Sequence, residues 1–379
     1  MKPLVSVFMF VRNGAPSVRR ALDSMMAQTY PNMEFVIQDA VSTDGTLDIL
    51  RGYGERLKIV SEPDSGPSDG LLRAMRRCSG EFIASCLADE ELLPDAVERA
   101  VDIFAREPGS GAVTGDAIIT DLGGKQTGLW TSGPFNLVDY LTADYTPYYC
   151  ASLFRRETLL AAGLQRDDWT MECVEFETWC RLAAHGAITY APGIIAKYAS
   201  HPDQSSNRPA DVVKHMRGRL KLIAGMCSSD GLLGDAPLLH TLFLWGHARR
   251  FCEHALQIGR ADLATDLHAL IRDRLASLPP VELDGVRYDE NFGRAAPAKQ
   301  SWLAQMRGRP AAPEPLLRIP AAPDKQLKGR MYALLAERYA ALGRPAEALR
   351  VWRDVAVLNG LLPGPDYPPV GYTQVTEGS

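Results

Sequence analysis

Short apolar runs alternate with amphipathic stretches along the first part of the chain. The run from Val5 to Val11 is almost continuous in apolar, β-forming residues, which is typical of a parallel strand buried on both faces. Similar runs predict three further strands, at 33–38, 57–61 and 81–87. Apolar positions at helical spacing predict helices at 18–27, 46–53, 70–78 and 94–105. Strands and helices that alternate in this way predict an α/β fold, doubly wound around a mostly parallel sheet.

The pattern changes at 203–210, where the chain becomes polar and contains proline. Beyond this point helical periodicity dominates, and it predicts helices at 212–226, 237–257, 261–275 and 327–358. An irregular stretch rich in proline and glycine, 278–324, interrupts them. We therefore expect an α/β domain over residues 1–208 and an all-α C-terminal extension over 209–379.

Two parts of this extension resemble each other. Segments 255–264 and 339–348 each place a Gly-Arg turn between amphipathic stretches, with an alanine four residues after the arginine. This is the pattern of tetratricopeptide-like helical hairpins. Because a stable solenoid needs three or more copies and two are visible, we expect hairpins rather than a repeat array.

Composition and charge narrow the classes of protein. The formal net charge of -5 gives no electrostatic reason to expect nucleic acid as a partner. The apolar run at 5–11 is too short for a transmembrane segment or a signal sequence, so we expect a cytoplasmic protein. Peripheral contact with the inner face of a membrane, or with another protein, through the helical tail stays open. The basic run Arg217 to Lys221 could contact phosphate or an anionic membrane, but a solvated helix face is the better interpretation.

The seven cysteines are scattered along the chain and form no C-x-x-C pair. This spacing predicts neither a zinc site nor a disulfide framework. We expect reduced, mostly buried thiols.

Acidic residues follow three of the predicted strands, where ligands bind in a doubly wound sheet. Asp39 leaves the second strand, and the loop at 62–70 after the third carries three carboxylates. Asp89-Glu90-Glu91 follow the fourth strand, and adjacent carboxylates are suitable ligands for Mg²⁺ or Mn²⁺. Each segment has a structural alternative, namely a turn, a helix N-cap or acids that favour a helix dipole.

Four blocks in order resemble glycosyltransferase family 2. Arg12-Asn13 follows the first strand, and Ser24 to Glu34 matches S-x-x-x-Q-T-Y-P-N-x-E. The family's D-G-S-T-D-G-T is similar to Asp39 to Thr46, and its E-x-D-x-G-x-x-D-A to Glu62 to Gly70. The resemblance covers about residues 3–205 and implies a GT-A fold, which is a Rossmann-like, mostly parallel sheet.

The resemblance also implies roles for individual residues. It assigns the nucleotide sugar, with a UDP-sugar favoured, to eight residues: Phe10, Arg12, Asn13, Asp39, Ser42, Asp44, Asp69 and Asp89. The family's metal motif aligns with Ala88 to Glu91, so that Glu90 and Glu91, with His201 of an H-P-x-x-x-S segment, are the implied ligands of Mg²⁺ or Mn²⁺. Alanine and glutamates stand where the family has aspartates.

An inverting transfer needs one base to deprotonate the acceptor hydroxyl. The family's D-x-[DE]-x-W-x-R block is similar to Glu175 to Arg181, which makes Glu175 the implied catalytic base. Glu172 and Glu177 are alternatives, and Glu177 could instead pair with Arg181 at i, i+4.

We therefore expect an inverting, metal-dependent glycosyltransferase. It would move a sugar from a nucleoside diphosphate sugar to a saccharide or lipid-linked acceptor, in bacterial surface polysaccharide or glycoconjugate biosynthesis. A catalytically degenerate, transferase-like binding or scaffold protein is the alternative.

Overall fold

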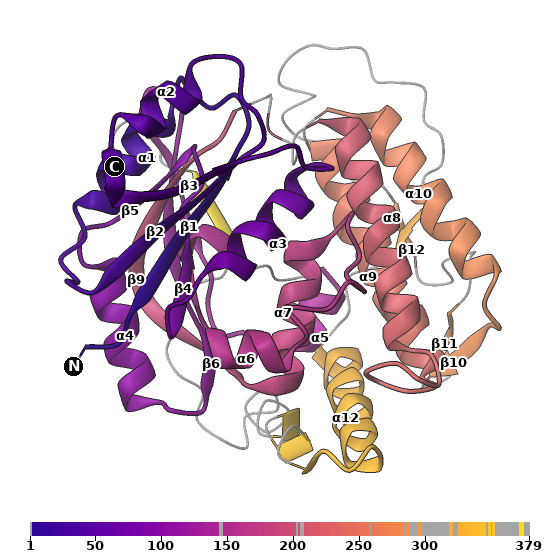
Figure 1. Ribbon diagram of the computed structural model, residues 1–379. Helices are drawn as coiled ribbons and strands as arrows, with labels where there is room; N and C mark the ends of the chain where they lie inside the picture. Colours follow the sequence, from indigo (N-terminus) through magenta and orange to yellow (C-terminus); the bar gives the residue numbers. More distant parts are fainter. Residues whose placement is uncertain are drawn as a thin grey trace. The chain divides into compact units, whose positions relative to one another are not determined.

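The chain divides into two compact units in the computed structural model (Figure 1). The first comprises Met1–Phe135, Thr146–Asn207 and Tyr367–Ser379, and the second Asn136–Tyr145 and Arg208–Asp366. The structure describes residues 2–143, 147–201, 204, 208–257, 259–283, 286–288, 295–297, 318–320, 325–345, 348–349, 351–352 and 371–374. A single division at residue 208 would place 136–145 in the first unit and 367–379 in the second. The structure instead assigns 136–145 to the second unit and 367–379 to the first. The division of the chain into domains 1–208 and 209–379 stays a prediction.

A ten-stranded sheet forms the centre of the first unit. Along its main path the strands are β14 (Gly371–Gln374), β7 (Gln126–Thr131), β6 (Ser110–Thr120), β8 (Ser152–Arg155), β4 (Phe82–Ser85), β1 (Val5–Val11), β2 (Met33–Asp39) and β3 (Leu57–Ser61). The strands β5 (Glu90–Leu92) and β9 (Ala187–Ala199) pair with each other, and β9 also pairs with β6. The four predicted strands are present and pair in parallel. Antiparallel pairs join β8, β7 and β14 to the sheet, which makes it mixed.

Helices cover the strands on both faces (Figure 1). Those of the first unit are α1 (Val18–Met26), α2 (Thr46–Arg51), α3 (Pro67–Arg77), α4 (Ala96–Arg106), α6 (Arg156–Ala161) and α7 (Val174–His185), with 3-10 turns η1 (Gly54–Arg56) and η2 (Tyr149–Ala151). Alternate β1 residues Val5, Val7 and Met9 are fully buried in one core with α1 and α4. Gly70 of α3 lies against Phe10, on the other face of β1. Because both faces are covered, β1 needs the continuous apolar run that predicted it.

The second unit is mainly helical. Its elements are α5 (Leu137–Leu141), α8 (Pro209–Met226), α9 (Pro237–Gln257), α10 (Ala261–Ala276), α12 (Lys325–Ala341) and the strand pairs β10 (Val281–Leu283) with β11 (Val286–Tyr288) and β12 (Ala295–Pro297) with β13 (Arg318–Pro320). Asp139 of α5 accepts hydrogen bonds from Lys328 (3.0 Å) and Tyr332 (2.8 Å) of α12. The predicted all-α extension therefore also contains short strands and, in α5, a helix from between β7 and β8.

The two similar Gly-Arg segments have the same helix ending. Gly259 and Gly343 adopt left-handed conformations (φ 76° and 70°) that favour glycine. The N–H of Arg260 donates to the Ala255 carbonyl at 2.8 Å, and that of Arg344 to the Tyr339 carbonyl at 2.9 Å. Each is the six-to-one hydrogen bond of a glycine-terminated helix. The sequence similarity therefore extends to the geometry of the two turns.

All seven cysteines are buried and none forms a disulfide, which confirms the expectation of reduced thiols. None of the described helices is long and apolar enough to cross a membrane.

Candidate active site

The carboxyl ends of the central strands come together at one edge of the sheet. Val11 of β1 pairs with Asp39 of β2, and Asp39 pairs with Ser61 of β3. The loops that follow these strands carry the predicted nucleotide-sugar residues. In a doubly wound sheet this is the edge at which ligands bind.

The loops after β1 and β2 are hydrogen-bonded to each other. The Asn13 side chain accepts from the Thr43 N–H (2.9 Å), and the Asn13 N–H donates to the Ser42 hydroxyl (2.9 Å). Asp44 accepts from the backbone of Ala15 and of Thr46, both at 3.0 Å. Ser42 and Asp44 therefore shape this edge, whereas Arg12 and Asn13 expose their side chains on it.

Asp39 has no exposed surface. Its carboxylate accepts from the Ser61 hydroxyl (2.6 Å) and the Ser42 N–H (3.2 Å). Val41, which takes the place of the glycine in the family's D-G-S-T-D-G-T pattern, has φ 54° and is 47% exposed. A β-branched residue is strained in this left-handed region. Asp39 thus anchors a strained loop, and in this conformation the loop covers it.

The loop after β3 gathers its carboxylates around arginines. Asp69 accepts from Arg73 (2.7 Å) and from the Ser65 N–H (2.9 Å). Burial raises the pKa of Asp64, and the positive charges of Arg73 and Arg12 oppose that rise. The charge of Arg12, in the loop after β1, thus acts on a carboxylate in the loop after β3.

Asp89 and His201 come together at the end of β4. One Asp89 carboxylate oxygen lies 3.7 Å from His201 Nε2 and accepts a hydrogen bond from Gln204 at 2.8 Å. The Gln204 side-chain oxygen accepts from the His201 N–H at 3.1 Å. Gln204 is not among the predicted site residues, and its only sequence signal is its place inside the H-P-x-x-x-S segment. Of the residues that follow His201 in that segment, Gln204 alone belongs to the described ones.

Glu90 and Glu91 make contacts of their own, apart from the pair of Asp89 and His201. Successive side chains of a strand point to opposite faces, and both residues lie in β5. Glu90 is buried and accepts from the Leu87 N–H at 2.7 Å, whereas Glu91 lies 3.5 Å from both Arg20 and Lys197. Burial raises the pKa of Glu90 well above its usual value, and the charges of Asp89 and Glu175 raise it further, which favours the neutral acid.

Ala88 lies against the loop that follows β1. A Cβ added to Gly14 would lie 3.0 Å from the Ala88 Cβ, so the loop after β1 passes directly against this position. A side chain larger than glycine at position 14 would therefore crowd Ala88.

Glu175 lies in the first turn of α7 and is exposed. Its negative charge contributes to raising the pKa of Glu90 and of Tyr149. Glu177, by contrast, is 1% exposed and is bound by Arg181 Nε (2.7 Å) and the Thr170 N–H (2.6 Å). Glu177 therefore has the structural i, i+4 role, and Glu175 is the better placed of the two for contact with a ligand.

The Q-T-Y-P-N-x-E block serves the framework. Gln28 donates to the Leu93 carbonyl (2.8 Å), and Tyr30 and Asn32 donate to carbonyls just before β1 (2.7 and 2.9 Å). Glu34 is buried and accepts from Ser6, Lys58 and both the N–H and the hydroxyl of Ser79. These bonds fix the order of the first strands, and with it the edge where the loops meet.

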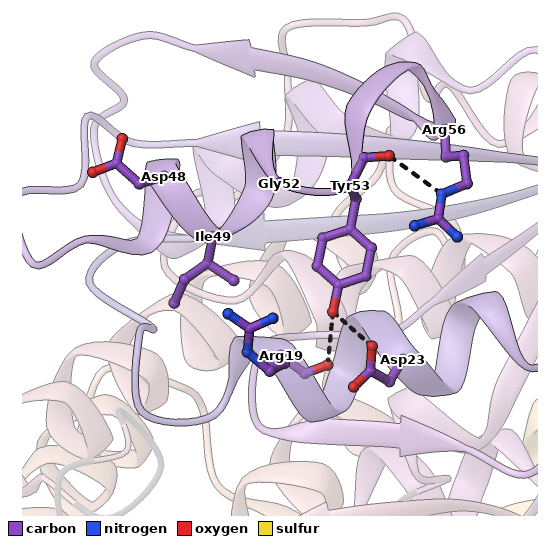
Figure 2. A pocket seen from close by; sticks show the side chains of 7 residues that line it. All are labelled: Arg19, Asp23, Asp48, Ile49, Gly52, Tyr53 and Arg56. Carbon is purple, nitrogen blue, oxygen red and sulfur yellow. Dashed lines mark hydrogen bonds between the residues drawn. The ribbon is translucent and has the colours of Figure 1, made fainter.

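A separate surface hollow of about 270 Å³ lies between α1 and α2 (Figure 2). Figure 2 shows the Tyr53 hydroxyl directed at Asp23, to which it donates at 2.7 Å. Burial and this hydrogen bond raise the pKa of Tyr53 to about 12. The hollow is lined by residues of α1 and α2 and by Gly52, Tyr53 and Arg56, which precede β3. We interpret the residues that line it as a structural contact between α1 and the segment that follows α2.

Comparison with known proteins identifies the domain that carries this edge. Residues 6–157 match the family model for glycosyl transferase family 2. The chain is 25% identical over 217 residues to a chondroitin synthase of Pasteurella multocida, covering 56% of this chain and 22% of the synthase. It is 30% identical over 126 residues to a putative teichuronic acid biosynthesis glycosyltransferase of Bacillus subtilis, covering 32% of this chain and 50% of that protein. The chain thus spans half or less of the length of these curated relatives.

The fold has solved counterparts. Residues 1–349 of Staphylococcus aureus TarS, in complex with UDP-GlcNAc, align with a TM-score of 0.54 at 15% identity, covering 99% of this chain and 97% of that one. At this identity the likeness concerns the fold. Residues 6–157 thus match glycosyl transferase family 2, and the chain has the GT-A-like fold of its solved counterpart.

Proposed function

We propose that this chain is an inverting glycosyltransferase, which moves a sugar from a nucleoside diphosphate sugar to a hydroxyl of a saccharide or lipid-linked acceptor. The observation that carries the proposal is the pairing of Asp89 with His201 just after β4, in a chain whose residues 6–157 match glycosyl transferase family 2. The names of the curated relatives support polysaccharide or glycoconjugate synthesis as the setting. The cytoplasm stays the predicted location.

The loops after β1 to β3 would bind the nucleotide. Arg12 and Asn13 are exposed and available to it, and Phe10 and Asp69 flank the same loops. Asp39, being buried, would act by holding the Ala40–Ser42 segment against the base. The TarS complex contains UDP-GlcNAc, so a UDP-sugar is the first donor to test.

Asp89 and His201 fit a divalent cation. A carboxylate and an imidazole with facing atoms 3.7 Å apart are a suitable pair of ligands for Mn²⁺, or for Mg²⁺ with more oxygen ligands. Within the described ranges no group of three or more His, Cys, Asp or Glu side chains could hold a metal. The pair would therefore need diphosphate oxygens to complete the coordination, and a cation bound there would neutralise charge on the departing diphosphate.

Glu175 would act as the base. Its carboxylate would take the proton of the acceptor hydroxyl while that oxygen bonds to the anomeric carbon and the bond from this carbon to the diphosphate breaks. The nucleoside diphosphate leaves with the electron pair of that bond. Glu90 would keep the turn before β5 closed by accepting a hydrogen bond from the Leu87 N–H.

Donor binding and turnover test this proposal separately. Calorimetry with UDP, GDP and their sugars, with and without Mn²⁺, measures binding, and release of the nucleoside diphosphate measures turnover. We expect Asp89→Ala to lose the Mn²⁺ dependence of binding and Asp39→Ala to weaken binding at least tenfold. Glu175→Gln should bind donor normally and lose transfer, whereas the matched control Glu172→Gln should retain both.

Each failure has a distinct meaning. Absence of binding to every nucleotide would refute the enzyme and its donor site together. Binding without turnover in the unaltered protein would favour the degenerate scaffold. Normal transfer by Glu175→Gln would refute the assignment of the base alone.

A further inference from the structure

A groove of about 400 Å³ lies within the helical unit, between α8 and α10. Its lining combines an apolar part, made by Leu220, Ala224 and Leu270, with a charged part, made by Arg217, Lys221, Arg274 and Asp273. The one acid among these residues lies 3.6 Å from Arg272. The groove thus joins hydrocarbon surface to excess positive charge.

An exposed basic stripe borders this groove. Lys214, Arg217 and Lys221 are spaced i, i+3 and i+7, which places them on one face of α8, and all three are exposed. Across the described part of the chain, none of the three forms an ion pair, although the nearby Arg208 pairs with Asp211 at 2.6 Å. The charge of the stripe is therefore available to an external partner.

The electrostatics around α8 agree with this geometry. Burial lowers the pKa of His215, and the positive charges of Arg219, Lys214 and Arg208 lower it further, against the opposing effect of Asp211. The potential here is positive in a chain whose formal net charge is -5. An anion is thus attracted to this face rather than to the molecule as a whole.

A partner of this groove must offer both negative charge for the basic stripe and apolar surface for the apolar lining. A soluble sugar nucleotide or an anionic polysaccharide would satisfy the cations but not the apolar lining. A phospholipid satisfies both, since its phosphate meets cations at the membrane surface and its chains meet apolar side chains just below. We propose that α8 and α10 dock the helical unit on an anionic phospholipid surface, with Arg217 and Lys221 at the headgroups and the groove facing the acyl region. This proposal does not depend on the glycosyltransferase activity.

Vesicle co-sedimentation of the full chain tests it. We expect binding to vesicles of phosphatidylglycerol and phosphatidylcholine, little binding to phosphatidylcholine alone, and weaker binding as salt increases. Each basic side chain near an anionic surface contributes about fivefold in affinity, so Arg217→Gln/Lys221→Gln should weaken binding about 30-fold. The matched control is Arg51→Gln/Arg106→Gln, which removes the same charge from exposed positions of the first unit and should bind vesicles normally.

A second variant tests the apolar lining. Ala224→Glu places a charge in the groove at a half-buried position, and it should reduce vesicle binding while circular dichroism and thermal unfolding stay those of the unaltered protein. Equal binding to phosphatidylcholine vesicles would overturn the proposal. So would unchanged binding by the Arg217→Gln/Lys221→Gln protein, or binding of soluble polyphosphate as tight as that of the anionic vesicles.

Discussion

Glu34 offers a quantitative test of the hydrogen bonds that hold the first strands of the sheet together. Burial raises the pKa of its carboxyl, but hydrogen bonds from Lys58, Ser6 and Ser79 outweigh burial and lower that pKa from 4.5 to about 2. A difference of about 2.5 units corresponds to about 3.4 kcal/mol, at about 1.36 kcal/mol for each unit. Glu34→Gln keeps the shape and loses the charge, so we expect it to lower the free energy of unfolding by about 2–3 kcal/mol at pH 7.

The direction of the Glu34 pKa shift determines how its contribution to stability changes with pH. A folded pKa below the unfolded one stabilises the protein above the unfolded value, and this stabilisation is lost as the pH falls through the folded value. For Glu34 the window is therefore from about pH 4.5 down to about pH 2. The advantage of the unaltered protein over Glu34→Gln should shrink by about 1.4 kcal/mol between pH 7 and pH 3.5.

Urea denaturation followed by tryptophan fluorescence measures both quantities. Lys58→Met is the control, because it removes one exposed donor and leaves the Ser6 and Ser79 bonds in place, so it should cost less than Glu34→Gln. An equal deficit of Glu34→Gln at pH 7 and pH 3.5 would show that the charge of Glu34 is not what stabilises the fold.

Two further predictions concern the same edge. Because burial raises the pKa of Glu90, the unaltered protein loses stability as the pH rises above about 4.5. The free energy of unfolding of Glu90→Gln should therefore increase relative to that of the unaltered protein between pH 4 and pH 8, as measured by denaturant titration. A relative stability of Glu90→Gln that decreases with rising pH would contradict this. Val41→Gly should raise the midpoint of thermal unfolding, since relief of about 1–2 kcal/mol of left-handed strain exceeds the entropy cost of glycine, whereas Val41→Ala, which keeps a Cβ, should gain less.

The sequence was informative where local pattern and burial coincide. The apolar run of β1 predicted a doubly covered strand because both of its faces are in fact covered. The Gly-Arg turns were recognisable because glycine is required at a left-handed helix end. Such features depend on a few neighbouring residues.

The rest depends on partners that are distant in sequence. The three-residue β5 forms only because β9 pairs with it, and that pairing decides that Glu90 and Glu91 point to opposite faces. The contact of Asp89 with Gln204 spans 115 residues, and no local periodicity signals it. For the same reason the pairing of β14 with β7 could not be predicted from a stretch that resembled a helical tail.

The assignment of α5 to the second unit has a consequence for how the protein is made. Val138 and Leu141 are fully buried there, and Asp139 bonds to Lys328, which is synthesised 189 residues later. At about 5–20 residues per second, a ribosome needs about 10–40 s to reach that partner. During this interval the nascent α5 presents apolar side chains without their final neighbours.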